Sequence, residues 1–93
     1  MNFDIVLLAQ PKNRPYLVRR VNGTYEQHSH MQSKQDCEEI IKLMKANKLP
    51  NFKNKELNKE YKVAIERLLT PKEYKRLQKK ENYRNINKGG NKK

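Results

Sequence analysis

The chain has a single cysteine, Cys37, so it cannot form an internal disulfide. One unpaired thiol is typical of proteins in the reducing cytosol. Long apolar runs are also missing, because the longest, from Ile5 to Ala9, is far too short to span a bilayer. No basic segment precedes that run, as a secretory signal would require. We therefore expect a cytoplasmic protein with no membrane partner.

Hydrophobic residues are scarce, at 34% of the 93 residues. A chain of this length and composition can form one domain with a modest core. We predict a single domain over residues 1–82, followed by a disordered basic tail over residues 83–93. Because a small core supplies little net stability by itself, we also expect a homodimer.

Acidic residues are outnumbered, since 10 Asp and Glu stand against 22 Lys and Arg, for a formal net charge of +12. More than half of this excess lies in residues 71–93, which carry nine bases and two acids. A chain of this kind is attracted to polyanions, of which nucleic acid is the most common. The alternative explanation is solubility, combined with a coding bias toward Lys and Asn.

Recognisable catalytic patterns are absent from the sequence. It has no Gly-rich phosphate loop before a helix and no Cys–His pair of known spacing. Cys37 lies on an apolar helical stripe, which is typical of a small core residue. We therefore expect no enzymatic activity, no cofactor and no resident metal.

The segment His28-Ser29-His30 can be interpreted as part of a metal site or as two surface histidines. Alternate residues of a strand point the same way, so the two imidazoles could chelate a metal, with Cys37 or Asp36 completing the site. Two surface histidines are the simpler interpretation, because no spaced Cys or His partner exists elsewhere.

The same histidine pair resembles the His-hydrophobe-His motif of the HUH endonucleases, which nick single-stranded DNA with a tyrosine. In this chain the middle residue is Ser29, and Tyr61 and Tyr74 are the candidate nucleophiles. Both tyrosines lie on apolar helix faces, so we expect them to be core residues instead.

Two runs rich in β-branched and aromatic residues flank Asn22-Gly23, and this pair is the strongest short-range signal for a β-hairpin. A two-residue type I′ turn there would set Val21 opposite Thr24 and Leu17 opposite His28. One face of the hairpin would carry Tyr16, Val18, Arg20, Tyr25, Gln27 and Ser29. The other face would carry Leu17, Arg19, Val21, Thr24, Glu26, His28 and His30. An apolar run over residues 3–9 predicts a third strand beside the hairpin.

After Met31 the apolar residues recur with the period of a helix. Ser33 predicts the cap of a first helix that ends near Asn47, and Asn54 predicts the cap of a second. The buried stripes would be Cys37, Ile40, Ile41 and Met44 in the first helix, and Leu57, Tyr61, Ala64, Ile65 and Leu68 in the second.

A third helix is predicted over residues 71–82, because Thr70-Pro71 and Glu73 form a capping box. Its bases recur at helical spacing, as Lys72, Lys75, Arg76, Lys79 and Lys80. Like charges at this spacing repel, which indicates an anionic partner, whereas an ordinary solvated face is the alternative. The predicted fold is thus α+β: a small three-stranded antiparallel sheet with an Asn-Gly hairpin, followed by three helices.

The hairpin supplies the candidates for reading bases, because a two-stranded ribbon fits the major groove. We assign base contacts to Arg19, Arg20 and Gln27, which carry groups that pair with base edges. The alternative is that Arg19 pairs with Glu26 across the strands and that the hairpin tyrosines pack on the helices. The full set of candidate DNA contacts is Lys12, Asn13, Arg14, Arg19, Arg20, Tyr25, Gln27, His28, Lys72, Lys75, Arg76 and Lys79.

Three segments carry a resemblance to the TcpK-like relaxosome accessory proteins, which bind the transfer origin of clostridial conjugative plasmids. They are the ribbon 16–30, the linker Lys12-Asn13-Arg14, and the segment 68–74. The resemblance implies a winged helix-turn-helix-like fold in which DNA meets the sheet and the N-terminal part. It also implies a homodimer that recognises repeated boxes near a transfer origin, with a relaxase or other transfer proteins as partners.

The sequence therefore predicts a non-enzymatic protein that binds double-stranded DNA, as an accessory factor of a mobile element. One alternative is an inhibitor, encoded by a phage or a mobile element, that binds an acidic protein surface. Another is an RNA-binding protein in which Tyr16 and Tyr25 stack on unpaired bases.

Overall fold

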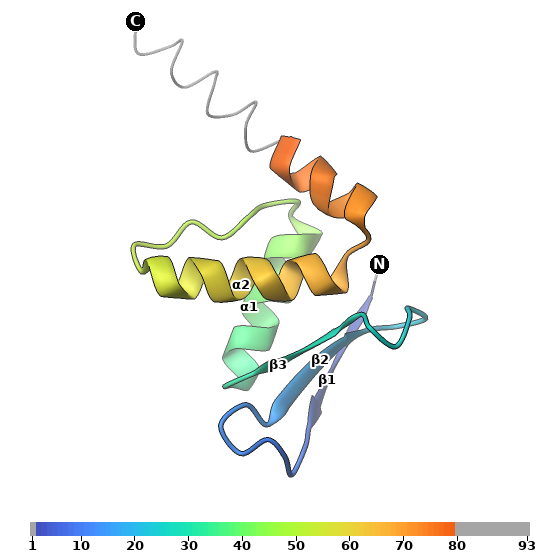
Figure 1. Ribbon diagram of the computed structural model, residues 1–93, viewed down its shortest axis with the longest axis vertical. Coiled ribbons are helices and arrows are strands. Elements are labelled where there is room, and N and C mark those ends of the chain that lie inside the picture. Colours follow the sequence, from blue (N-terminus) through green and yellow to red (C-terminus); the bar gives the residue numbers. More distant parts are fainter. Residues whose placement is uncertain (1, 80–93) are drawn as a thin grey trace, which may run out of the picture.

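A computed structural model describes residues 2–79 of the chain. Its elements follow the order β1 (Phe3–Leu7), β2 (Tyr16–Arg20), β3 (His28–Met31), α1 (Lys34–Lys45) and α2 (Lys55–Leu68), as Figure 1 shows. A further helix over residues 71–79, called helix 71–79 below, follows α2. The predicted α+β class, with a three-stranded antiparallel sheet and three helices, is confirmed. The tail predicted over residues 83–93 lies outside the described residues.

The sheet has the order β1-β2-β3, and both pairings are antiparallel. In β1 and β2, Ile5 lies opposite Val18 and Asp4 lies opposite Arg19. The first strand ends at Leu7, two residues before the predicted end at Ala9. No helix within residues 2–79 is long and apolar enough to cross a membrane.

The predicted hairpin register is wrong by two residues. Leu17 lies opposite His30 instead of His28, and the strands are joined by the longer connection 21–27. A type I′ turn needs positive φ at both central residues, but only Asn22 (φ 61) has it and Gly23 does not. Because side chains alternate with a period of two, a shift of two residues leaves every strand residue on its predicted face.

The predicted helix caps are present. The hydroxyl of Ser33 accepts a hydrogen bond from the backbone N–H of Asp36 (3.1 Å), at the start of α1. The side-chain carbonyl of Asn54 accepts from two backbone N–H groups at the start of α2. Asn47 adopts a left-handed conformation (φ 56) just after α1, where the sequence predicts the helix to end.

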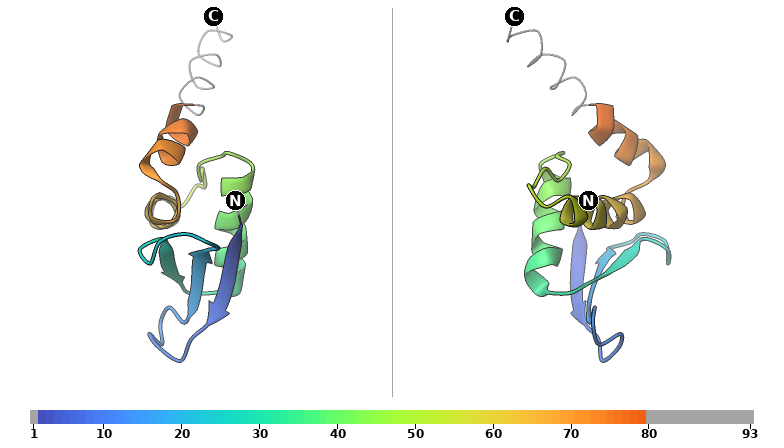
Figure 2. Two further views of the ribbon diagram at one scale, coloured as in Figure 1. Left: turned by 90° about the vertical axis from the view of Figure 1, so that its right-hand side faces the viewer. Right: turned by 60° about the vertical axis from the view of Figure 1, so that its left-hand side comes forward.

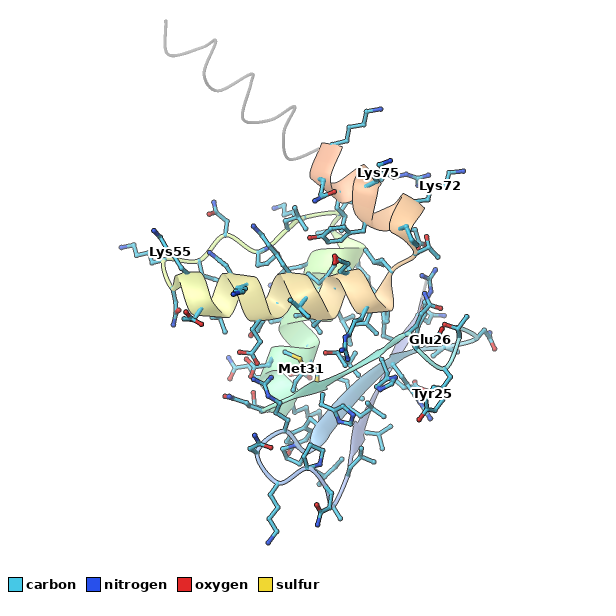
Figure 3. The ribbon with its side chains drawn as sticks, viewed as in Figure 1. Tyr25, Glu26, Met31, Lys55, Lys72 and Lys75 are labelled. Carbon is cyan, nitrogen blue, oxygen red and sulfur yellow. The ribbon has the colours of Figure 1, made fainter. Side chains whose placement is uncertain are left out.

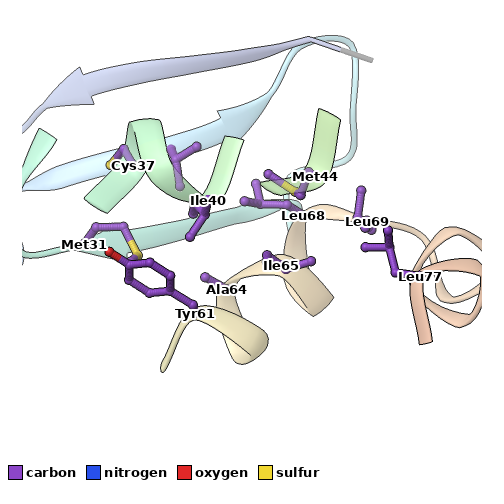
Figure 4. Packing of buried hydrophobic residues seen from close by; sticks show 11 residues of the cluster. Met31, Cys37, Ile40, Met44, Tyr61, Ala64, Ile65, Leu68, Leu69 and Leu77 are labelled. Carbon is purple, nitrogen blue, oxygen red and sulfur yellow. The ribbon is translucent and has the colours of Figure 1, made fainter. Parts of the chain in front are cut away.

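The core lies between one face of the sheet and the helices (Figure 4). From the sheet, Val18 and Met31 point into it. The helices contribute both predicted stripes, in which all but Ile41 and Leu57 are fully buried. The buried hydrophobic residues are Val18, Met31, Cys37, Ile40, Met44, Tyr61, Ala64, Ile65, Leu68, Leu69 and Leu77. The opposite face of the sheet, which we call the outer face, carries Leu17, Arg19, His28 and His30.

Candidate nucleic-acid interface

Helix 71–79 packs on the domain by one side only. Leu77 is 2% exposed, and Tyr74 is half-buried against the core. Apart from Glu73, the remaining long side chains are exposed and surround a shallow hollow, lined by Lys72, Lys75, Arg76, Gln78 and Lys79. Figure 3 shows the side chains of Lys72 and Lys75 extending away from the body of the protein.

The cations of this helix are free of acidic partners within residues 2–79. The ion pairs there involve Arg14, Arg19 and Arg20, and none involves a base of helix 71–79. The predicted basic stripe is therefore an exposed surface over the described part of the helix. Lys80, the last residue of the predicted stripe, lies outside the described residues.

Glu73, the one acid in residues 71–79, points toward Arg20 of β2 and away from the exposed cations of the helix. Its carboxylate accepts a hydrogen bond from the backbone N–H of Thr70 (2.8 Å), while the Thr70 hydroxyl accepts from the N–H of Glu73 (3.2 Å). This arrangement is the predicted capping box. The same carboxylate accepts two hydrogen bonds from the guanidinium of Arg20, at 2.5 and 2.8 Å. The Arg20 hydrogen bond lowers the pKa of Glu73 to about 2, so this acid stays ionised at neutral pH.

Arg20 and Gln27, two of the three predicted base-contact residues, are engaged in internal contacts. Both donate to the backbone carbonyl of Leu68, Arg20 at 3.3 Å and Gln27 at 3.0 Å. Leu68 ends α2, and the last carbonyls of a helix have no partner within the helix. The hydrogen bond with Glu73 also raises the pKa of Arg20.

Arg19, Tyr25 and His28 remain accessible on or beside the outer face. Tyr25 is 89% exposed, and its ring lies edge-to-face with His28, with 5.6 Å between centroids. Arg19 is more than half exposed and lies 3.8 Å from Asp4, its neighbour across β1 and β2, instead of pairing with Glu26. These side chains line a hollow of about 590 Å³ on the outer face and along the 21–27 connection.

The predicted contacts at residues 12–14 lie in the β1–β2 connection, away from the other candidates. The β1–β2 connection is at the opposite end of β2 from the 21–27 connection, and Figure 1 shows it far from helix 71–79. Lys12 and Asn13 are exposed there, whereas Arg14 pairs with Glu60 of α2 (2.5 Å). The twelve predicted contacts therefore do not form one continuous surface.

The part of the chain that the structure describes places no third metal ligand beside the histidine pair. His28 and His30 share the outer face, with 5.4 Å between ring centroids, and no group of three potential metal ligands occurs within residues 2–79. Cys37 is buried in the core, and burial raises the pKa of its thiol to about 11. The carboxylate of Asp36 accepts a hydrogen bond from the Tyr61 hydroxyl.

The tyrosines of the HUH-like alternative lie away from the histidines. Tyr61 is 4% exposed and belongs to the core, on the other side of the sheet from His28 and His30. Burial, followed by the hydrogen bond to Asp36, raises its pKa. Tyr74 is half-buried, and burial raises its pKa as well. Neither phenol is presented as an accessible nucleophile beside the imidazoles.

No known protein family matches the chain, and no curated protein or solved structure matches it significantly.

Proposed function

We propose that this chain is a non-enzymatic, cytoplasmic protein that binds double-stranded DNA, with helix 71–79 on the phosphates. The observation that carries the proposal is the separation of charge on that helix. Lys72, Lys75, Arg76 and Lys79 are exposed, whereas Glu73 is held against the domain by Arg20. Phosphate contacts need positive charge and reach, and long cationic side chains on one helix supply both.

The size of the effect can be estimated from counterion release. Each phosphate that a protein neutralises adds about −0.9 to the slope of log K against log[salt] for duplex DNA. Four contacts from helix 71–79 would give a slope of about −3 to −4, or roughly a hundredfold loss of affinity between about 50 and about 200 mM salt.

Sequence recognition is assigned to the hairpin. Arg19 and Tyr25 are exposed and can reach bases or sugars. His28 is half-buried and its Nδ1 lies 2.7 Å from the carbonyl oxygen of Tyr25, so only its other ring nitrogen is assigned to recognition. Arg20 and Gln27 are not part of this proposal, since their donors bind Leu68 and Glu73. The resemblance to TcpK-like proteins makes repeated boxes near a transfer origin the first duplexes to test, with the chain acting as a homodimer.

Fluorescence anisotropy would test the proposal with one labelled sequence supplied as duplex DNA, single-stranded DNA and RNA, over a salt series. We expect the duplex to bind most tightly, with the steep salt dependence given above. Tightest binding to RNA or to the single strand would instead favour stacking on the exposed Tyr25. Absence of binding to all three at low salt would refute the proposal and favour an acidic protein surface as the partner.

A further inference from the structure

The 21–27 connection and helix 71–79 meet at one point, the end of α2. Arg20 and Gln27 come from the hairpin, and both donate to the carbonyl of Leu68. Arg20 continues to the carboxylate of Glu73, which also caps the backbone N–H of Thr70. A single carboxylate therefore fixes the start of helix 71–79 and ties that start to the hairpin.

The connection itself is held in one shape by internal hydrogen bonds. The side-chain carbonyl of Gln27 accepts from the N–H of Thr24 (2.9 Å), and the N–H of Gly23 donates to the carbonyl of Arg20 (3.2 Å). Gly23 leaves room for this packing, since an added Cβ would lie 2.6 Å from the Gln27 oxygen and 2.9 Å from the Arg20 Cβ. Tyr25, at 89% exposure, points out of this fixed loop.

The loop and the helix lie on the same side of the protein in all three views of Figures 1 and 2. Their chemistry differs. Residues 21–27 contain no Lys or Arg and one acid, Glu26, so this segment cannot bind a polyanion by charge. It does present the amide of Asn22, the hydroxyl of Thr24 and the phenol of Tyr25, all of which are exposed. Amide and hydroxyl groups pair with base edges.

We infer that the 21–27 loop and helix 71–79 form one composite surface that engages a single DNA duplex, with Arg20 and Glu73 as positioning residues. The inference rests on the proposed function. The helix holds phosphates without regard to sequence, and the loop, placed by the Arg20–Glu73 pair, contacts bases or sugars in the adjacent groove. Sequence preference then depends on a contact that does not itself touch DNA.

Glu73→Gln provides a test in which charge and positioning predict opposite results. Removing an acid raises the net charge by one, so charge alone predicts tighter binding to every duplex. Loss of positioning predicts weaker binding to a preferred duplex, selected from a random pool, and no loss on a scrambled one. We expect the preference ratio to fall about tenfold, as for the loss of one good base contact.

Glu60→Gln is the matched control, because Glu60 is also paired with an arginine, Arg14, and both residues lie outside the composite surface and outside the hollow beside the 21–27 connection. It should strengthen binding slightly to both duplexes and leave the preference ratio unchanged. Arg20→Lys keeps the charge but cannot make both hydrogen bonds, so its preference ratio should fall between those of wild type and Glu73→Gln.

Glu73→Gln could disturb folding, so Tyr25→Ala provides a second test of the same surface. Tyr25 is almost fully exposed, and its truncation should leave the fold intact. It should lower the preference ratio while the salt slope stays at the wild-type value, because the phosphate contacts remain. A wild-type protein that binds duplexes without preference would overturn this inference and leave standing the proposal that helix 71–79 binds duplex phosphates. The inference is also overturned, with the proposed function left standing, if Glu73→Gln behaves like Glu60→Gln. Failure of the wild type to bind any duplex would overturn both.

Discussion

Arg20 on β2 and Glu73 on helix 71–79 are 53 residues apart in the sequence and share two hydrogen bonds, at 2.5 and 2.8 Å. Their side chains are 18% and 30% exposed, so the pair is more shielded than an ordinary surface ion pair. Such bidentate pairs are stronger and more directional than single contacts. The pair joins the sheet to the helix that carries the exposed cations.

The Arg20–Glu73 pair predicts a specific pH dependence of stability. The folded-state pKa of Glu73 is about 2, against an ordinary value of 4.5. A depressed pKa gives stability that is fully present above the unfolded-state value and is lost as the pH falls through the folded-state value. After allowance for partial exposure, we expect Glu73→Gln to cost about 1–3 kcal/mol of unfolding free energy at neutral pH.

Chemical denaturation of wild type and Glu73→Gln from neutral pH to about pH 2 would check this prediction. The difference between the two proteins should shrink steadily below the ordinary pKa of a glutamate. A constant difference over the whole range would mean that the charge of Glu73 contributes nothing.

Gly23→Ala should destabilise the protein by about 1–3 kcal/mol, because the added methyl group overpacks the loop. The methyl carbon would lie 2.6 Å from the side-chain oxygen of Gln27 and 2.9 Å from the Cβ of Arg20. Asn22→Gly is the paired control. Asn22 has a positive φ that glycine adopts easily, so this change should be close to neutral. Equal melting temperatures for Gly23→Ala and wild type would show that the loop packs differently.

Cys37 should be inert toward thiol reagents in the folded protein. It is 0% exposed, and burial raises its pKa to about 11, so little thiolate forms at neutral pH. Ellman's reagent should therefore react at the rate of unfolding in native buffer and rapidly in denaturant. Rapid reaction of the native protein would contradict the placement of α1 on the sheet.

The sequence was sufficient for features that depend on neighbouring residues. The caps at Ser33, Asn54 and Thr70 were predictable because a cap joins residues two or three positions apart. The faces of the strands were also predictable, since they survive a register shift of two residues.

Features set by distant residues could not be predicted. The connection of the hairpin ends at Gln27, whose side chain donates to the carbonyl of Leu68, 41 residues away. No pattern of neighbouring residues indicates that Arg20 pairs with Glu73. In the sequence, an arginine that forms an internal ion pair therefore cannot be distinguished from one that is free to contact bases. The pairing of Arg19 with Asp4 would have required the β1–β2 register, which the sequence does not specify.

The central claim is that helix 71–79 holds duplex phosphates, and the salt dependence of binding by Lys75→Ala/Arg76→Ala tests it most directly. Lys53→Ala/Lys55→Ala is the matched control, since it removes two exposed lysines at and just before the start of α2. Figure 3 shows Lys55 at the end of α2 away from helix 71–79. We predict that the slope of log K against log[salt] becomes shallower by about two in the helix variant, stays near the wild-type value in the control, and leaves sequence preference intact. An unchanged slope in the helix variant, or an equal change in both variants, would contradict the account.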